Sequence, residues 1–215
     1  AFCSCSIENI ILPNNITTIS DGLFDGCKKL TSLNIPDTVT SIGVYSFVYC
    51  TGLTSLNIPD TVTSIGERAF IGCYNLTSIN IPNGITNIKK HVFEMCRSLT
   101  QIDIPDSVTS IGYSAFYDCR NLKSITIPEN VTSIGSEVFG GCNSLTSVTI
   151  LNSTPITVGN KCFISTPETK TLTVPIDATG YSTTWCDTIW SSLNSYLSTE
   201  EINYVLTNNG TSYIY

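Results

Sequence analysis

Hydrophobic positions recur along this chain at a fixed interval of 23 residues. Three columns keep this interval over six copies: the phenylalanines Phe24, Phe47, Phe70, Phe93, Phe116 and Phe139, the cysteines Cys27, Cys50, Cys73, Cys96, Cys119 and Cys142, and the prolines Pro13, Pro36, Pro59, Pro82, Pro105 and Pro128. A unit this short cannot bury its apolar side chains alone, so neighbouring units must stack and cover one another. The pattern therefore predicts a solenoid that gains one rung per repeat.

Each unit opens with a segment of the form LxxLxI, as in the copy that starts at Leu30 and reads LTSLNIPDTVTSIGVYSFVYCTG. Alternation of apolar and polar residues is typical of a strand with one buried face, so we expect Leu33 to point inward and Ser32 outward. Pro36 has no N–H to donate and ends the strand. Successive strands should run parallel, about 4.8 Å apart. About eight of them are predicted, from segments that start at Ile7, Leu30, Leu53, Leu76, Leu99, Leu122, Leu145 and Thr169.

The rest of each unit supplies the other walls of the core. Val39 and Ile42 are three residues apart, a spacing that fits either a short strand or a tight helical turn. Phe47 and Cys50 fill the remaining side. The predicted fold class is therefore a mainly β repeat solenoid.

The repeats extend over residues 1–175. Ala1-Phe2 matches the AFxxC segment of a later unit, such as Ala69-Phe70 with Cys73, so the chain starts in mid-repeat. We expect a fragment from which an export signal, and any earlier repeats, have been removed. The seventh unit is irregular, with Phe163 one residue late.

Residues 176–215 are predicted to form a C-terminal cap that covers the last rung. A short helix is expected in this cap, because apolar side chains recur every four residues at Tyr181, Trp185, Ile189 and Leu193. Asn209-Gly210 lies between two strand-like runs and suggests a hairpin.

The charge balance narrows the possible partners. The chain has 17 Asp and Glu against 10 Lys and Arg, a net charge of -7. This charge repels phosphate backbones and anionic lipids, so we expect no nucleic acid partner. No apolar run approaches the roughly 18 residues of a spanning helix, and we expect no direct membrane insertion.

The cysteine column suggests three possibilities: disulfides, a metal site or a reduced core. Parallel side chains on identical rungs do not converge as a disulfide requires, and cysteine is among the most readily buried residues. A metal site has little support from the single histidine, His91, whose position in other repeats is variable. We therefore expect six buried, reduced cysteines and no metal or other cofactor. Four cysteines lie outside this column and stay undecided: Cys3, Cys5, Cys162 and Cys186.

An acidic column follows the prolines, with Asp37, Asp60, Asp106 and Glu129 on different rungs. Calcium binding is one interpretation of this column. However, Asn83 occupies the same position in another copy, and Asp or Asn after Pro is a common turn residue. Turn formation is the favoured interpretation.

The LxxLxI opening is similar to the leucine-rich strand signature, and the IPxxVxxIGxxxFxxC that follows resembles the BspA-like class of bacterial and protist surface proteins. The resemblance covers residues 1 to about 175. It implies a right-handed leucine-rich-repeat array with a C-terminal cap, and a non-enzymatic surface or secreted binding module in adhesion or host interaction. The implied partner is an extracellular protein or glycan. The alternative is a structural spacer that presents another domain.

In leucine-rich proteins the outward face of the sheet commonly carries the ligand. The side chains on that face are predicted to be short, polar and nearly all uncharged. They do not include the aromatic and arginine side chains that dominate binding hot spots. The face is either a solvated surface or a glycan or protein contact. Its residues are Ser32, Asn34, Ser55, Asn57, Ser78, Asn80, Gln101, Asp103, Ser124, Thr126, Ser147 and Thr149.

Overall fold

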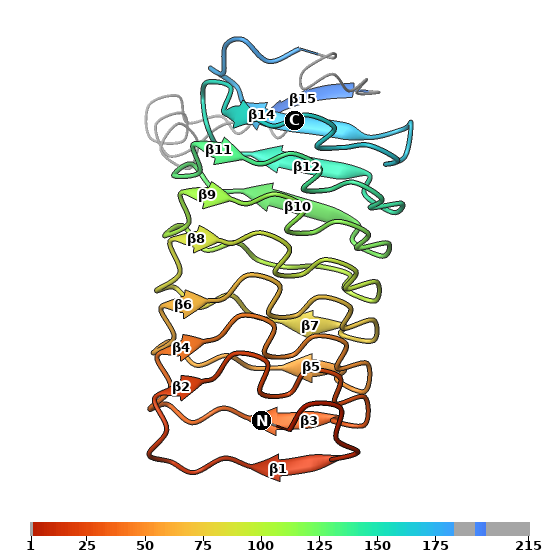
Figure 1. The fold of residues 1–215 in the computed structure, drawn as a ribbon. Helices are drawn as coiled ribbons and strands as arrows, with labels where there is room; N and C mark the ends of the chain where they lie inside the picture. Colours follow the sequence, from red (N-terminus) through yellow and green to blue (C-terminus); the bar gives the residue numbers. More distant parts are fainter. Residues whose placement is uncertain (1, 183–191, 197–215) are drawn as a thin grey trace, which may run out of the picture.

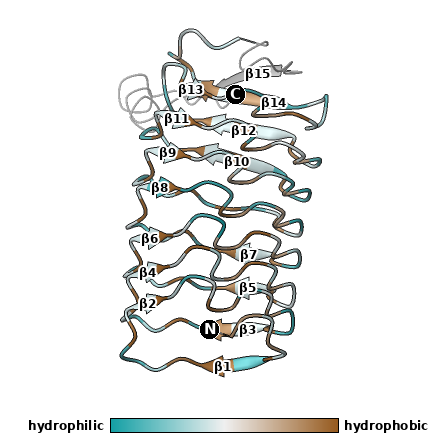
Figure 2. Ribbon diagram, viewed as in Figure 1, coloured by the Kyte–Doolittle hydropathy of each residue, from teal (hydrophilic) through white to brown (hydrophobic). Residues whose placement is uncertain are grey.

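The computed structural model describes residues 2–182 and 192–196 of the chain. They form a solenoid of stacked rungs with the N-terminal rung at one end (Figure 1). Hydrophobic and hydrophilic segments fall at the same places on successive rungs (Figure 2). The predicted mainly β repeat solenoid is confirmed.

Two stacks of parallel strands form two walls of the solenoid. The first stack carries the LxxLxI segments and contains β1 (Asn9–Ile11), β3 (Ser32–Asn34), β5 (Ser55–Leu56), β7 (Ser78–Ile79), β10 (Ser124–Ile127), β12 (Ser147–Ile150), β14 (Thr171–Pro175) and β15 (Ser192–Tyr196). The second contains β2 (Thr18–Ile19), β4 (Ser41–Ile42), β6 (Ser64–Ile65), β8 (Asn87–Ile88), β9 (Ser110–Ile111), β11 (Ser133–Ile134) and β13 (Thr157–Val158). The Val39–Ile42 segment, for which two conformations were possible, therefore ends in a short strand.

The register of the strands follows the sequence period. Ser41 pairs with Ser64, and Ser124 with Ser147, each 23 residues on. In the irregular seventh unit the partner shifts by one residue, so that Ser147 pairs with Thr171. In the rung of Leu99 the first stack has no strand, although Ile102 and Ile104 are buried as expected and β9 is present in the second stack.

A third wall connects the second strand of each rung to the first strand of the next. Its backbone is also bonded between rungs: Phe47 N–H donates to Ala69 O at 2.8 Å, and Tyr49 N–H donates to Ile71 O at 2.9 Å. Each rung turns twice here through left-handed residues, as at Tyr45 (φ 58°) and Tyr49 (φ 52°). We call this the turn wall; its segments are residues 43–52, 66–75, 89–98, 112–121 and 135–144.

The core is built around the phenylalanine column. All eight phenylalanines of the chain form one stack, with neighbouring ring centroids 5.2–5.8 Å apart. Rings from Phe24 to Phe163 are buried, whereas Phe2 on the first rung is 36% exposed. Phe163 joins the stack although it comes one residue late in the sequence, because the extra residue is accommodated in another part of the rung.

The expected helix is wrong at its C-terminal end. Leu193 lies in β15, which pairs in parallel with β14 and sets Leu193 opposite Leu172. The strand stack therefore continues beyond residue 175. Tyr181, the first position of the expected helix, is not in a helix either. The positions within 183–191 and the expected hairpin at Asn209-Gly210 are outside the described residues.

Candidate functional site

The predicted ligand face lies on the outer side of the first strand stack. Its side chains are exposed, except that Asn80, Ser147 and Thr149 are partly buried. Equivalent residues face each other across neighbouring strands, as Ser55 does with Ser78 and Thr126 with Thr149. The structure therefore confirms the outward direction of the columns, while ligand binding stays a prediction.

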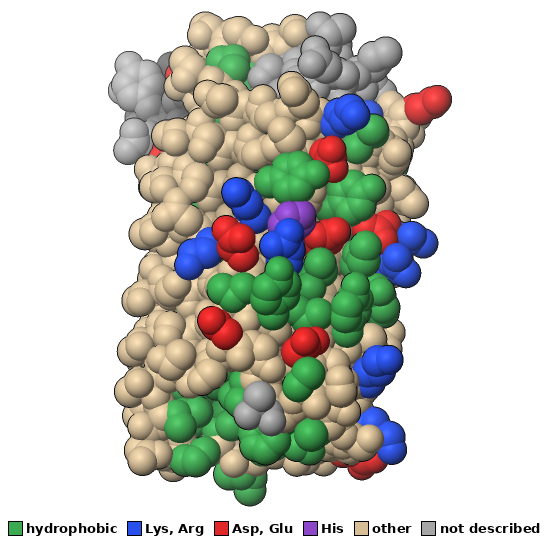
Figure 3. Space-filling view, in the orientation of Figure 1, with side chains coloured by type: hydrophobic (Ala, Val, Ile, Leu, Met, Phe, Trp, Pro, Cys, Tyr) green, Lys and Arg blue, Asp and Glu red, His purple; other side chains and the backbone are tan. Residues whose placement is uncertain are grey.

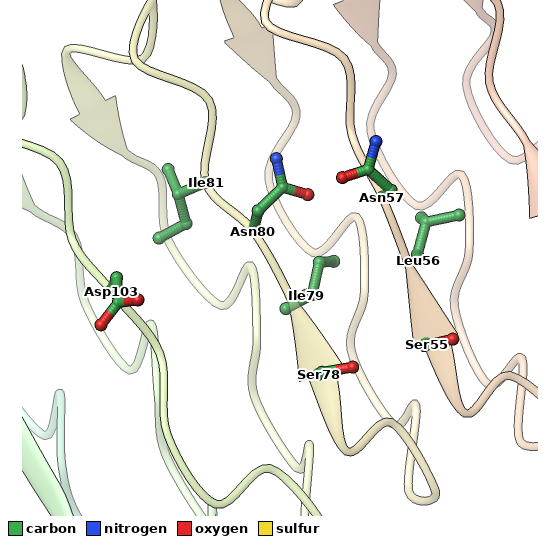
Figure 4. Close-up of a pocket in the computed structure, with 8 residues that line it drawn as sticks. All are labelled: Ser55, Leu56, Asn57, Ser78, Ile79, Asn80, Ile81 and Asp103. Atoms are coloured by element: carbon green, nitrogen blue, oxygen red, sulfur yellow. The ribbon is translucent and has the colours of Figure 1, made fainter.

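A shallow hollow of about 400 Å³ lies on this face. Ser55 and Asn57 line one side, Ser78 and Asn80 the next rung, and Asp103 the far edge (Figure 4). Backbone and side-chain oxygens and amides dominate its polar lining. Such a hollow can accept hydrogen-bonding groups of a ligand, and Asp103 adds one carboxylate.

Asn80 has a structural role that the sequence did not reveal. Its Nδ2 donates to Ile58 O at 2.7 Å, and Ile58 N–H donates to its Oδ1 at 2.7 Å. The side chain thus replaces a pair of ladder bonds between two rungs. Because both of its polar atoms are engaged, Asn80 shapes the hollow and offers little further hydrogen bonding.

The cysteine column is buried and belongs to the core. Each thiol of the column donates to the carbonyl oxygen of a phenylalanine on the preceding rung at 3.0–3.4 Å. Burial raises the pKa of Cys50 and Cys142 to about 12, so these thiols are poor nucleophiles. The reduced state of the column stays a prediction.

The cysteines outside the column lie in different surroundings. Cys162 is buried beside the phenylalanine stack, and burial raises its pKa to about 12. Cys3 is exposed and Cys5 half-buried. Cys186 lies outside the described residues.

Other candidate chemistry is not assembled into a site in the described part of the chain. There, no group of three or more His, Cys, Asp or Glu side chains is placed to hold a metal ion. His91 Nδ1 lies 2.6 Å from Glu94 Oε2 within the turn wall. The segments of the acidic column do form the expected turns, as Val39 N–H donates to Pro36 O at 2.9 Å. No helix in the described residues is long and apolar enough to cross a membrane.

The turn wall carries the aromatic and arginine side chains that the sheet face lacks. Tyr45, Tyr49 and Tyr113 are 38–43% exposed there. The sequence shows that the position of His91 is variable, with Tyr45, Arg68, Ser114 and Glu137 in the other repeats, but it was not considered as a binding surface. The signal was the change of residue type at this position from one repeat to the next.

Comparison with known proteins decides the family. The BspA type leucine rich repeat region (6 copies) matches residues 1–123, 64–184 and 109–206. The chain belongs to this family. No curated protein matches it.

Solved structures of bacterial leucine-rich repeat proteins share the fold. A Bacteroides ovatus leucine-rich repeat protein is 27% identical, with a TM-score of 0.60, over 91% of this chain and 57% of its own. A leucine rich cell surface protein from Faecalibacterium prausnitzii is 27% identical, with a TM-score of 0.51, over 98% and 65%. The T. pallidum leucine rich repeat protein is 23% identical, with a TM-score of 0.53, over 94% and 83%. The chain thus spans less than two thirds of the length of the B. ovatus and F. prausnitzii proteins.

Proposed function

We propose that this chain is a non-enzymatic binding module at a cell surface or in secreted form, which attaches to an extracellular protein or glycan in adhesion or host interaction. The observation that carries the proposal is the in-register polar face of the first strand stack, with its hollow between Ser55 and Asp103. The description of the F. prausnitzii protein as a cell surface protein supports the location. Within the described rungs the phenylalanine stack occupies the centre of the core, which supports a non-catalytic role.

An array of glycans and extracellular-matrix proteins tests the proposal on the full chain. We expect at least one class to bind in a saturable way. A variant that blocks the hollow, Ser55→Lys with Ser78→Lys, should weaken that binding, whereas Thr18→Lys on the second strand stack should not. Thr18→Lys is the control because it also adds a lysine at an exposed position of a short strand.

The rival function is a spacer that holds another domain away from the surface. Its support is the uninterrupted stacking of rungs, which gives a stiff rod. If no class on the array binds in a saturable way, the result would favour the spacer and contradict the binding module.

A further inference from the structure

The surface of the turn wall differs from the two strand walls because it changes from rung to rung. Outward residues of the strand walls are mostly the small polar residues Ser, Thr and Asn, as in Ser55 and Ser78. The equivalent column of the turn wall reads Tyr45, Arg68, His91, Ser114 and Glu137, of which only Ser114 is buried. A partner on a periodic surface can shift by one rung and find the same contacts, whereas a non-repeating surface fixes a single register. Recognition of one defined partner therefore favours the turn wall.

The composition of the turn wall is that of a protein interface. All three arginines of the chain, its only methionine and its only histidine lie there, with five of the six tyrosines whose side chains are described. Tyr, Met and Arg are the residues enriched in protein interfaces and at their hot spots. Figure 3 shows the histidine, in purple, surrounded by basic, acidic and hydrophobic side chains. The arginines, methionine and tyrosines are Arg68, Arg97, Arg120, Met95, Tyr45, Tyr49, Tyr74, Tyr113 and Tyr117.

These side chains are held in place before any partner binds. The Arg68 guanidinium lies 5.7 Å from the centre of the Tyr45 ring, and that of Arg97 lies 4.7 Å from the centre of the Tyr74 ring. Tyr113 forms an edge contact with His91, at 5.1 Å between ring centres. Pre-ordered side chains lose less conformational entropy on binding, so more of the contact energy contributes to affinity.

Hydrogen-bond donors are in excess on this surface. The Asp118 carboxylate accepts from Arg97 Nε at 2.9 Å and from Arg120 Nε at 2.8 Å, and the Glu137 carboxylate accepts from Tyr113 at 3.2 Å. Each guanidinium has five N–H donors, of which these bonds use only part. Within the described residues Arg68 forms no ion pair, and its Nη1 donates to Tyr45 Oη at 3.3 Å. The complementary groups on a partner are carboxylates.

Long-range repulsion does not oppose an acidic partner at this place. The wall carries five cations and four anions, although the whole chain has a net charge of -7. Beyond a Debye length of about 8 Å the other acidic residues are screened at physiological salt. The cations are Arg68, Lys89, Lys90, Arg97 and Arg120, and the anions are Glu67, Glu94, Asp118 and Glu137.

From these observations we propose that the turn wall, around Tyr45, Arg68 and Tyr113, is a docking surface for an acidic protein segment. Carboxylates of the segment pair with the guanidinium groups, and its apolar side chains pack on the tyrosine rings. The inference rests on the proposed function only in taking the chain to be a binding module, and it places this partner away from the strand face.

The test is a selection of displayed, randomised peptides on the full chain. Enriched clones should carry Asp or Glu next to aliphatic or aromatic residues. For a chosen clone, Tyr45→Asn with Arg68→Asn should raise Kd at least about tenfold, and Ser55→Ala with Ser78→Ala less than about twofold. Asn tolerates the left-handed backbone at both turn-wall positions, so the fold should be kept, which circular dichroism and the denaturation midpoint check.

A charge exchange makes the test sharper. Arg68→Glu should abolish binding of the acidic clone, and changing the critical Asp or Glu of that clone to Lys should restore binding to the variant. Failure to enrich any clone, enrichment of clones without carboxylates, or unchanged affinity in the turn-wall variants would overturn this inference. Loss of binding in the serine variants alone would also overturn this inference, but it would not contradict the proposed binding function. That function is contradicted only if no class on the glycan and matrix-protein array binds.

Discussion

One phenylalanine and one cysteine per rung join neighbouring rungs in two different ways. The phenylalanine ring stacks on the ring of the next rung, while its carbonyl oxygen accepts the thiol of a cysteine, as Phe47 does from Cys73 at 3.1 Å. The same carbonyl also accepts Cys50 N–H, at 3.2 Å. Each residue of the pair therefore contributes both to its own rung and to the junction with another.

The first prediction concerns the phenylalanine stack. Phe93→Ala removes a ring that is 1% exposed and in contact with rings on both sides, so we expect a loss of about 3–5 kcal/mol of unfolding free energy. Phe2→Ala, at the exposed end of the stack, should cost much less. Urea denaturation measures both, and similar midpoints for Phe93→Ala and the unchanged chain would contradict the stacking model.

A second prediction is a loss of stability at alkaline pH. Burial raises the pKa of Cys50 to about 12 from an ordinary value of 9.0. Above pH 9 the unfolded chain loses thiol protons that the folded chain keeps, so the unfolding free energy falls as pH rises toward 12. Stability from this source is fully present below pH 9.

Urea denaturation in reductant at pH 8 and at about pH 10.5 measures this effect. Other groups titrate in the same range, so the comparison is made with Cys50→Ala. That variant should lose less stability between the two pH values than the unchanged chain does. An equal loss would mean that the buried thiol does not contribute to the pH dependence.

At the scale of elements, the strands of this solenoid are short and the bonds between them are supplemented by side chains. β5 and β7 each contain two residues, and the Asn80 side chain adds two bonds to the backbone of Ile58. The turn wall adds a ladder of its own. A rung is therefore held by many short contacts instead of one long sheet.

Asn80 and Asn57 provide a matched pair for the third prediction. Asn80→Ala removes the partners of Ile58 N–H and C=O, and Ile58 is only 1% exposed. The loss should lower the unfolding free energy by about 1–3 kcal/mol. Asn57 occupies the same position one repeat earlier but is exposed, so Asn57→Ala should change stability by less than about 0.5 kcal/mol. Equal effects in denaturation experiments would show that the side-chain bridge is not important.

On the scale of the whole molecule, the array is a one-dimensional stack in which each rung contacts mainly its neighbours. Deletion of residues 53–75 removes one period of 23 residues and joins Gly52 to Leu76 in the same phase. We expect the shortened chain to keep the far-ultraviolet circular dichroism of the solenoid and to unfold cooperatively, with a smaller denaturant dependence because less surface is exposed on unfolding.

An out-of-phase deletion is the control for this fourth prediction. Removal of residues 53–63 places polar residues at core positions and should prevent folding. Loss of the fold in the in-phase deletion as well would mean that the rungs are not interchangeable.

The sequence by itself determined the period, the solenoid, the three core columns and the outward direction of the polar columns. These follow from a repeat whose units bury their apolar positions only by stacking in register, so that the position of a residue in the repeat fixes its side of the wall. Phe163 shows the strength of this constraint, because it enters the stack although it is one residue out of phase.

Contacts between rungs were decided only by the tertiary structure. The four-residue spacing of Tyr181 to Leu193 suggested a helix, but Leu193 lies in a strand because the edge of β14 offers backbone groups that need partners. Tyr45 and Arg68 are 23 residues apart, and their pairing on the turn wall depends on side-chain directions at left-handed positions that the repeat pattern does not encode. Periodicity specifies which residues are neighbours, whereas local backbone geometry decides what those neighbours form.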